Sequence, residues 1–225
     1  RDSTNSEFLS VYNNRVLRDK FYLFLQNIYG IYPDLKFHMQ IIEVCEKFET
    51  DEHIYQALVN SLPDLKTPGS DLFYALPALR KQKKEIQKQT SALLPVNHKI
   101  NGYLEIGSTG RYVKSLKKVF DFKGPVFLTN DFQPTYSASD LMERGRITKI
   151  GKFFDLDNYV PISQIVSDQS LDLVTCYIGL HHCPLDRLAP YLASINRVLR
   201  PGGHFILRDH DATTAEMKTF CSLVH

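Results

Sequence analysis

The spacing of apolar side chains changes once along the chain, directly after Pro95. Before this proline, apolar residues such as Phe21, Phe24 and Leu25 recur at intervals of three or four positions, which is the period of an amphipathic helix. Prolines and glycines separate these runs and mark where one helix ends and the next begins. The pattern therefore predicts three or four helices, the last of which is amphipathic and spans about residues 70–91.

After Pro95, short apolar runs alternate with helical ones, which is typical of βαβ units and a parallel sheet. Strands joined by crossover helices predict an α/β fold, with a doubly wound, mostly parallel Rossmann-like sheet in residues 96–225. An all-helical region in residues 1–95 precedes this domain. The expected strands are residues 102–106, 126–130, 147–152, 171–176 and 204–208, and the expected helices are residues 112–120, 140–144 and 188–199.

Composition and charge narrow the class of protein. The chain has 225 residues, of which 43% are hydrophobic, and this suffices for a globular core. A net charge of +2 and a pI near 8.3 require neither nucleic acid nor a membrane as a partner. Because the sequence has no run of about 18 apolar residues and no secretory segment, we expect an intracellular, cytoplasmic protein.

The cysteines point to reduced thiols and not to a metal site. They are scattered along the chain without a C-x-x-C pair, so no metal is expected. The alternative is a zinc site that combines Cys183 with His181 or His182. The four cysteines are Cys45, Cys176, Cys183 and Cys221.

A glycine turn follows the first expected strand of the sheet, in the stretch Tyr-Leu-Glu-Ile-Gly-Ser-Thr-Gly-Arg at residues 103–111. Gly107 and Gly110 allow the backbone to approach a ligand at the carboxyl end of that strand. Glu105 can hold an ammonium group of the ligand, directly or through water. The spacing matches only part of the dinucleotide fingerprint, and an ordinary strand-to-helix turn is the alternative.

Two acidic residues follow the next two expected strands. Asp131 ends the second strand, at the position where a carboxylate can accept hydrogen bonds from both hydroxyls of a ribose. Asp155 follows the third strand and can accept the amino group of an adenine, with Phe154 or Leu156 against the ring. A helix cap at Asp131 and a solvated loop acid at Asp155 are the alternatives.

This ordered set of motifs resembles the class I S-adenosylmethionine-dependent methyltransferases over about residues 96–211. The strongest single piece is the Leu-Arg-Pro-Gly-Gly turn at residues 199–203. The resemblance implies S-adenosylmethionine as the cofactor, S-adenosylhomocysteine as the product and a small-molecule methyl acceptor of unknown identity. It implies that the cofactor is bound by Glu105, Gly107, Ser108, Thr109 and Gly110 at the methionine end, by Asp131 at the ribose and Phe132 beside it, by Asp155 and Leu156 at the adenine, and by Cys176 and Tyr177 beneath the methyl donor.

Candidate catalytic residues follow the fourth and fifth expected strands. Methyl transfer needs mainly in-line positioning of a nucleophile and, for some acceptors, removal of one proton. The ligand crevice of an open α/β sheet lies outside the carboxyl ends of its strands, so His210, Asp209 and His181 are expected to face the acceptor. His210 is the first choice for the base, and a charged, solvated loop is the alternative.

Two other functions stay open. The basic residues within 80–88 are typical of a solvated helix face, but they can also serve a nucleic-acid methyltransferase. Thr109 and Arg111 stand where the family's turn carries glycine, which motivates a degenerate domain that acts as a scaffold or activating subunit.

The regions on either side of the expected sheet carry two further expectations. The N-terminal helices are expected to form a lid that selects the substrate. By the resemblance, two more strands would follow the fifth. We therefore expect either a longer natural protein or an oligomer or partner chain that completes the sheet.

Overall fold

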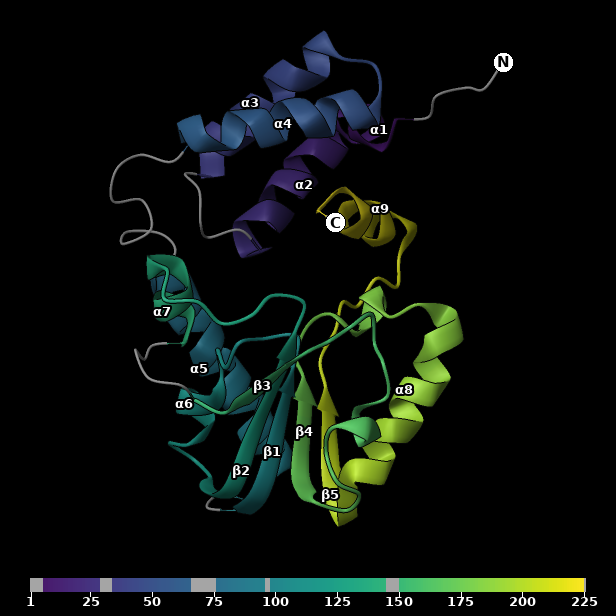
Figure 1. Ribbon diagram of the computed structural model, residues 1–225. Coiled ribbons are helices and arrows are strands. Elements are labelled where there is room, and N and C mark those ends of the chain that lie inside the picture. Colours follow the sequence, from purple (N-terminus) through teal and green to yellow (C-terminus); the bar gives the residue numbers. More distant parts are fainter. Residues whose placement is uncertain (1–5, 29–33, 66–75, 96–97, 145–149, 225) are drawn as a thin grey trace. The chain divides into compact units, whose positions relative to one another are not determined.

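The computed structural model describes the chain except for residues 1–5, 29–33, 66–75, 96–97, 145–149 and 225 (Figure 1). The chain divides into two compact units, residues 1–80 with 211–225 and residues 81–210. The domain boundary between residues 95 and 96 stays a prediction.

The first unit is helical, as the apolar period predicts. The amphipathic helices bury one face each, with Phe21, Ile41, Ile54 and Phe220 among the buried side chains. The helices of this unit are α1 (Glu7–Tyr12), α2 (Arg15–Ile28), α3 (Asp34–Lys47), α4 (Asp51–Leu65) and α9 (Ala215–Val224).

The carboxylate of Asp51, the first residue of α4, closes the N-terminus of α1. It accepts hydrogen bonds from the backbone nitrogens of Glu7 at 2.8 Å and Phe8 at 3.1 Å. Ser6 donates its hydroxyl proton to the same carboxylate and accepts from the nitrogen of Leu9 at 3.0 Å. These contacts satisfy N–H groups that the first turn of a helix leaves unpaired, and they fasten α1 to α4.

The second unit contains a five-stranded sheet in the order β3-β2-β1-β4-β5. All neighbouring strands are parallel, so their carboxyl ends lie at one edge. The predicted α/β fold with a doubly wound parallel sheet is confirmed. The strands are β1 (Lys99–Ile106), β2 (Asp121–Asn130), β3 (Lys152–Asp155), β4 (Leu171–Cys176) and β5 (Leu199–Leu207).

The third strand differs from its prediction. We expected residues 147–152, of which 147–149 lie outside the described residues, but the strand runs over Lys152–Asp155. Phe153 packs on one face of the sheet and Phe154 on the other, so burial on both faces selects these two residues.

Helices cover both faces of the sheet (Figure 1). One face carries α8 (Leu185–Val198) and the short helix η2 (Ile162–Gln164). The opposite face carries α5 (Leu76–Leu93) and α6 (Val113–Leu116). The remaining elements, α7 (Ala138–Arg144) and η3 (Leu180–His182), follow β2 and β4.

No helix within the described ranges is long and apolar enough to cross a membrane.

Burial makes two of the cysteine thiols poorly reactive in the folded chain. All four cysteines are free, and burial raises the pKa of the Cys45 and Cys176 thiols to about 12. Since the thiolate is the reactive form, these two thiols are poor nucleophiles at neutral pH.

Candidate functional site

The turn after β1 is built around the buried carboxylate of Glu105, which is 0% exposed. One oxygen accepts from the Ser108 hydroxyl at 2.5 Å and from the Tyr112 backbone nitrogen at 3.2 Å. The other accepts from the Tyr103 hydroxyl at 3.0 Å. Burial raises the pKa of Glu105 above its ordinary value. Both carboxylate oxygens therefore accept hydrogen bonds from residues of the protein, and these bonds stabilise the turn.

Ser108 closes the turn from the other side. Its hydroxyl oxygen accepts from the backbone nitrogens of Gly110 at 3.1 Å and Arg111 at 2.9 Å. Gly107 and Gly110 have φ angles of +75° and +101°, and a Cβ on Gly107 would lie 3.0 Å from the carbonyl oxygen of Ile178. The two glycines thus occupy positions that side chains disfavour.

Thr109, a departure from the family's glycine-rich turn, has a structural partner. Its side chain is buried, and its hydroxyl donates to Asp140 on α7 at 3.0 Å. Asp140 also faces the buried guanidinium of Arg144 at 3.5 Å. Threonine at this position therefore fastens the turn to α7.

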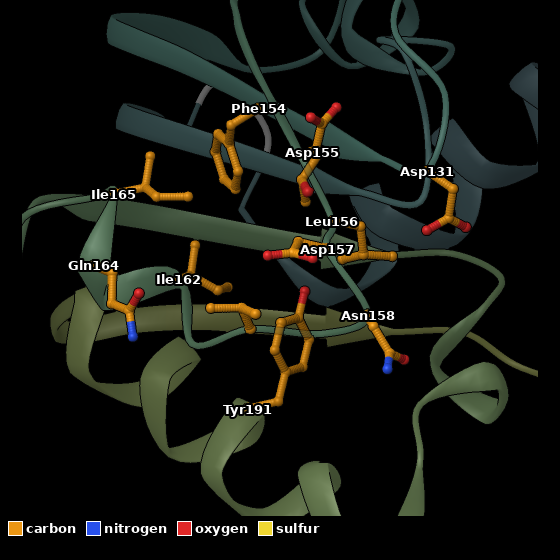
Figure 2. Close-up of a pocket in the computed structure, with 12 residues that line it drawn as sticks. Asp131, Phe154, Asp155, Leu156, Asp157, Asn158, Ile162, Gln164, Ile165 and Tyr191 are labelled. Carbon is orange, nitrogen blue, oxygen red and sulfur yellow. The ribbon is translucent and has the colours of Figure 1, made fainter.

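A cavity of about 440 Å³ lies at the carboxyl ends of β2 and β3 (Figure 2), within the range of roughly 300–1,000 Å³ that small-molecule sites occupy. Three residues predicted to bind a cofactor, Asp131, Asp155 and Leu156, line it. Phe132, also predicted, is 77% exposed. The cavity is lined by Thr129, Asp131, Phe154, Asp155, Leu156, Asp157, Asn158, Val160, Ile162, Gln164, Ile165 and Tyr191.

Two hydroxyl groups among the lining residues have no partner within the described part of the chain. They are the side-chain oxygens of Thr129 and Tyr191, residues that are 0% and 1% exposed. Buried polar groups in proteins nearly always have a hydrogen-bond partner. The cavity therefore fits a ligand that carries polar groups and apolar surface, as a ribonucleoside does.

The rim of the cavity contains a left-handed turn. Asp157, Asn158 and Tyr159 have φ angles of 45°, 51° and 63°, a conformation that costs a non-glycine residue roughly 1–2 kcal/mol. The Tyr159 hydroxyl holds the turn by donating to the carbonyl of Gly179 at 2.5 Å. Strained backbone of this kind clusters at ligand-binding sites.

Cys176 and Tyr177, which were predicted to lie beneath the methyl donor, are buried at the end of β4 with exposures of 0% and 3%. The Tyr177 hydroxyl lies 2.8 Å from that of Thr90 on α5. Its ring meets the ring of Tyr112 edge-on at 4.9 Å. Cys176 packs in the core on the face of the sheet that carries α8, and Tyr177 packs in the core on the face that carries α5 and α6.

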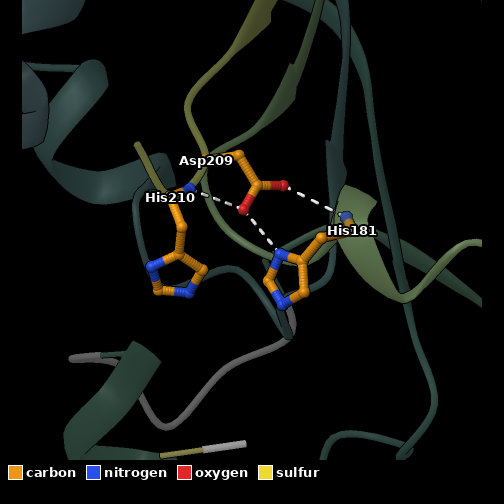
Figure 3. A group of neighbouring side chains, drawn as sticks. All are labelled: His181, Asp209 and His210. Carbon is orange, nitrogen blue, oxygen red and sulfur yellow. Dashed lines mark hydrogen bonds and ion pairs between the residues drawn. The ribbon is translucent and has the colours of Figure 1, made fainter. Parts of the chain in front are cut away.

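The three predicted catalytic residues lie together at the carboxyl ends of β4 and β5 (Figure 3). Nδ1 of His181 is 2.5 Å from Oδ1 of Asp209, and the His181 backbone nitrogen donates to Oδ2 at 3.2 Å. The His210 backbone nitrogen donates to Oδ1 at 2.8 Å. Asp209 therefore orients the ring of His181.

The charges of this cluster follow from its surroundings. Burial alone would raise the pKa of Asp209, but the hydrogen bonds from His210 and His181 together lower it. Burial, followed by the neighbouring His181, lowers the pKa of His210. The lowered pKa keeps Asp209 ionised at neutral pH, and this carboxylate holds the ring of His181 by Nδ1.

The same three residues present a set of donor atoms that all lie within 4.8 Å of one another. Two histidines and a carboxylate are ligands that zinc and iron accept. The oxygens of Asp209 accept three hydrogen bonds from N–H groups, which stabilise the carboxylate. The expectation of no metal stays a prediction.

The basic face on α5 is present. Arg80, Lys81, Lys84 and Lys88 are exposed, and Lys83 is half-buried. A nucleic-acid partner for this face stays an open alternative.

Part of the chain is similar to a known protein family and to several solved structures. Residues 104–207 match the family model described as "Methyltransferase domain". Among solved structures, an S-adenosylmethionine dependent methyltransferase from Mesorhizobium loti is 21% identical with a TM-score of 0.37, and the match covers 58% of this chain and 50% of that one. A 1,6-didemethyltoxoflavin-N1-methyltransferase from Burkholderia thailandensis is 22% identical, with a TM-score of 0.38 and coverages of 67% and 59%. The CurJ carbon methyltransferase is 19% identical, with a TM-score of 0.44 and coverages of 96% and 53%.

The chain spans about half the length of the first solved structures that it matches. No curated protein matches it. The stretch that matches the family model extends from β1 to the last residue of β5, so this part of the chain is similar to methyltransferase domains over the whole sheet.

Proposed function

We propose that the chain transfers a methyl group from S-adenosylmethionine to a small-molecule acceptor. The observation that carries this proposal is the cavity that Asp131 and Asp155 line together, at the carboxyl ends of two neighbouring parallel strands. In open α/β sheets, ligands bind at this edge. When bound, S-adenosylmethionine supplies an electrophilic methyl carbon on a sulfonium.

Each part of the cofactor has residues that fit it. Asp131 would accept hydrogen bonds from the ribose hydroxyls, and Asp155 with Leu156 would hold the adenine. The turn from Gly107 to Gly110 would bind the methionine end. Glu105 supports this turn from its buried position, so its effect on the methionine end is indirect.

His181 is the base in this proposal, with Asp209 as the residue that orients it. Asp209 would orient the ring through Nδ1, and Nε2 of His181 would take the proton that the acceptor loses as its bond to the methyl carbon forms and the methyl–sulfur bond breaks. The proton then passes to solvent. His210, the first choice from the sequence, contacts Asp209 through its backbone nitrogen, whereas the ring of His181 is the one that Asp209 holds.

Calorimetry with S-adenosylmethionine and S-adenosylhomocysteine tests the cofactor site. Asp131→Asn should weaken binding roughly 10- to 100-fold, because a hydrogen bond to a charged group contributes about 1.5–3 kcal/mol. Asp121→Asn, at the opposite end of the same strand, is the matched control and should bind normally. Failure of the unsubstituted chain to bind either compound at millimolar concentration would overturn the proposal.

A screen of small amines, hydroxyls and carbon acids with isotope-labelled cofactor tests the reaction. On the best acceptor, His181→Asn should lower kcat by about 10²- to 10⁴-fold, the range that general bases contribute, with cofactor affinity unchanged. His204→Asn, an exposed histidine on β5, should leave kcat unchanged. Equal rates for both variants would remove His181 from the mechanism.

The two rival functions give different results. A nucleic-acid substrate held by α5 would bind with a steep dependence on salt, and charge reversal at Lys84 and Lys88 would abolish it. A scaffold would bind neither cofactor nor product in calorimetry.

A further inference from the structure

Two buried side chains that line the cavity carry hydroxyl groups, although the sequence pattern predicts core positions for both. Tyr191 lies on α8 and Thr129 on β2, and both occupy positions of the apolar period. Figure 2 shows the phenol oxygen of Tyr191 directed from α8 toward the middle of the lining side chains. Neither hydroxyl has a hydrogen-bond partner among the described residues.

The Tyr191 ring is held in place on several sides. Tyr159 packs edge-on against it at 5.1 Å between ring centroids. The backbone carbonyl of Tyr191 accepts a hydrogen bond from the Ser194 hydroxyl at 2.7 Å. The oxygen of that hydroxyl in turn accepts from the Ile162 backbone nitrogen at 3.0 Å. Burial also raises the pKa of Tyr191, which keeps the phenol neutral and able to donate. The ring is therefore a fixed donor that faces the cavity.

We propose that Tyr191 selects the base of the bound nucleoside. Its hydroxyl donates a hydrogen bond to a ring nitrogen of adenine, while Thr129 offers a second hydroxyl to the same ligand. This inference rests on the proposed function, and it adds a specificity residue on α8 to the acidic residues at the carboxyl ends of β2 and β3. A buried donor without a partner rejects ligands that lack the matching acceptor, because it then stays unsatisfied.

The test compares S-adenosylhomocysteine with its 1-deaza, 3-deaza and 7-deaza analogues, each of which replaces one ring nitrogen by a C–H group. The unsubstituted chain should bind one of the three about three- to tenfold more weakly, the change that corresponds to one hydrogen bond. Tyr191→Phe should bind S-adenosylhomocysteine with the same loss and should no longer distinguish that analogue. Equal affinity of Tyr191→Phe and the unsubstituted chain for S-adenosylhomocysteine would overturn the inference.

Stability provides an independent readout. Without ligand, Tyr191→Phe should unfold at the same or a higher temperature, because the substitution removes a buried hydroxyl that has no partner within the described ranges. A clear fall in melting temperature would mean that the hydroxyl is already satisfied, and would contradict the inference. Thr129→Val is the second variant and should behave in the same way.

Tyr12→Phe is the matched control, a buried tyrosine whose hydroxyl lies 3.5 Å from His38. It should leave every affinity unchanged. Absence of any S-adenosylhomocysteine binding by the unsubstituted chain contradicts the proposed function itself. Normal binding with no difference among the analogues contradicts only the role of Tyr191.

Discussion

Replacing Glu105 by glutamine and by alanine separates the charge of this residue from its hydrogen bonds. In Glu105→Gln, the amide oxygen can keep the bonds from Ser108 and Tyr112. The amide nitrogen then faces the hydroxyl of Tyr103, whose proton can move to Thr175 at 2.7 Å. All partners stay satisfied and a buried charge is removed, so we expect a change in unfolding free energy within about 1 kcal/mol.

Glu105→Ala leaves three donors without their acceptor. The Tyr112 backbone nitrogen is buried and cannot turn elsewhere, whereas the hydroxyls of Ser108 and Tyr103 can find other partners in part. An unsatisfied buried group costs about 1–3 kcal/mol, and the lost side chain leaves a cavity. We expect a total loss of about 3–5 kcal/mol and no measurable cofactor binding, because the turn loses its internal support.

The dependence on pH gives the sharper test. The pKa of Glu105 is raised above 4.5 by burial, so the folded chain holds this proton more tightly than the unfolded chain. Stability that this group contributes is present below pH 4.5 and is lost as pH rises toward the folded pKa. Urea unfolding should therefore show the unsubstituted chain losing stability relative to Glu105→Gln as pH increases. Glu85→Gln, on the exposed side of α5, is the control. A rise in the stability of the unsubstituted chain relative to Glu105→Gln as pH increases would refute the reasoning.

Four further predictions concern other contacts. Asp209→Asn should lower kcat about 10- to 100-fold, and combining it with His181→Asn should add little, because the two residues act as one unit; additive losses in steady-state kinetics would contradict this. The lowered pKa of His210 means that the folded chain binds fewer protons than the unfolded chain, so melting temperature should rise with pH up to about 6.5 and less steeply in His210→Asn. Asp51→Ala should destabilise the helical unit by about 1–3 kcal/mol in urea unfolding, since α1 loses its cap. Thr109→Gly should destabilise by about 1–2 kcal/mol through the lost bond to Asp140 and added backbone freedom, and tighter cofactor binding by this variant would show that threonine impairs the site.

The sheet was largely predictable because parallel strands buried on both faces are written as short apolar runs. The fourth strand, Leu171–Cys176, has the predicted bounds. The rule that strand carboxyl ends meet at one edge also placed Asp131 and Asp155 together. The third strand was misplaced, because its bounds follow from the packing of Phe153 and Phe154 on opposite faces of the sheet, and this packing is visible only in the structure.

Other parts of the site left little or no signal in the sequence. Tyr191 and Thr129 occupy core positions of their elements, and only the cavity distinguishes them from packing residues. The left-handed turn left a weak signal in the sequence, since Asp157 and Asn158 are of residue types that tolerate a positive φ. Tyrosine tolerates a positive φ less well, so Tyr159 gave no such signal. The rule of carboxyl ends brought His181 near Asp209, while the choice of His181 over His210 needed the contact between Nδ1 and Oδ1.

Thr109 has a structural role in the turn after β1 that the sequence alone does not reveal. A family glycine replaced by threonine suggests a blocked cofactor turn if the side chain is imagined to point at the ligand. Here the side chain is buried and bonded to Asp140 on α7, while Gly107 and Gly110 keep the positive φ angles that a tight turn requires. Threonine at this position restricts the backbone and ties the turn to α7 through a side-chain hydrogen bond. The turn therefore keeps its conformation although a glycine is replaced.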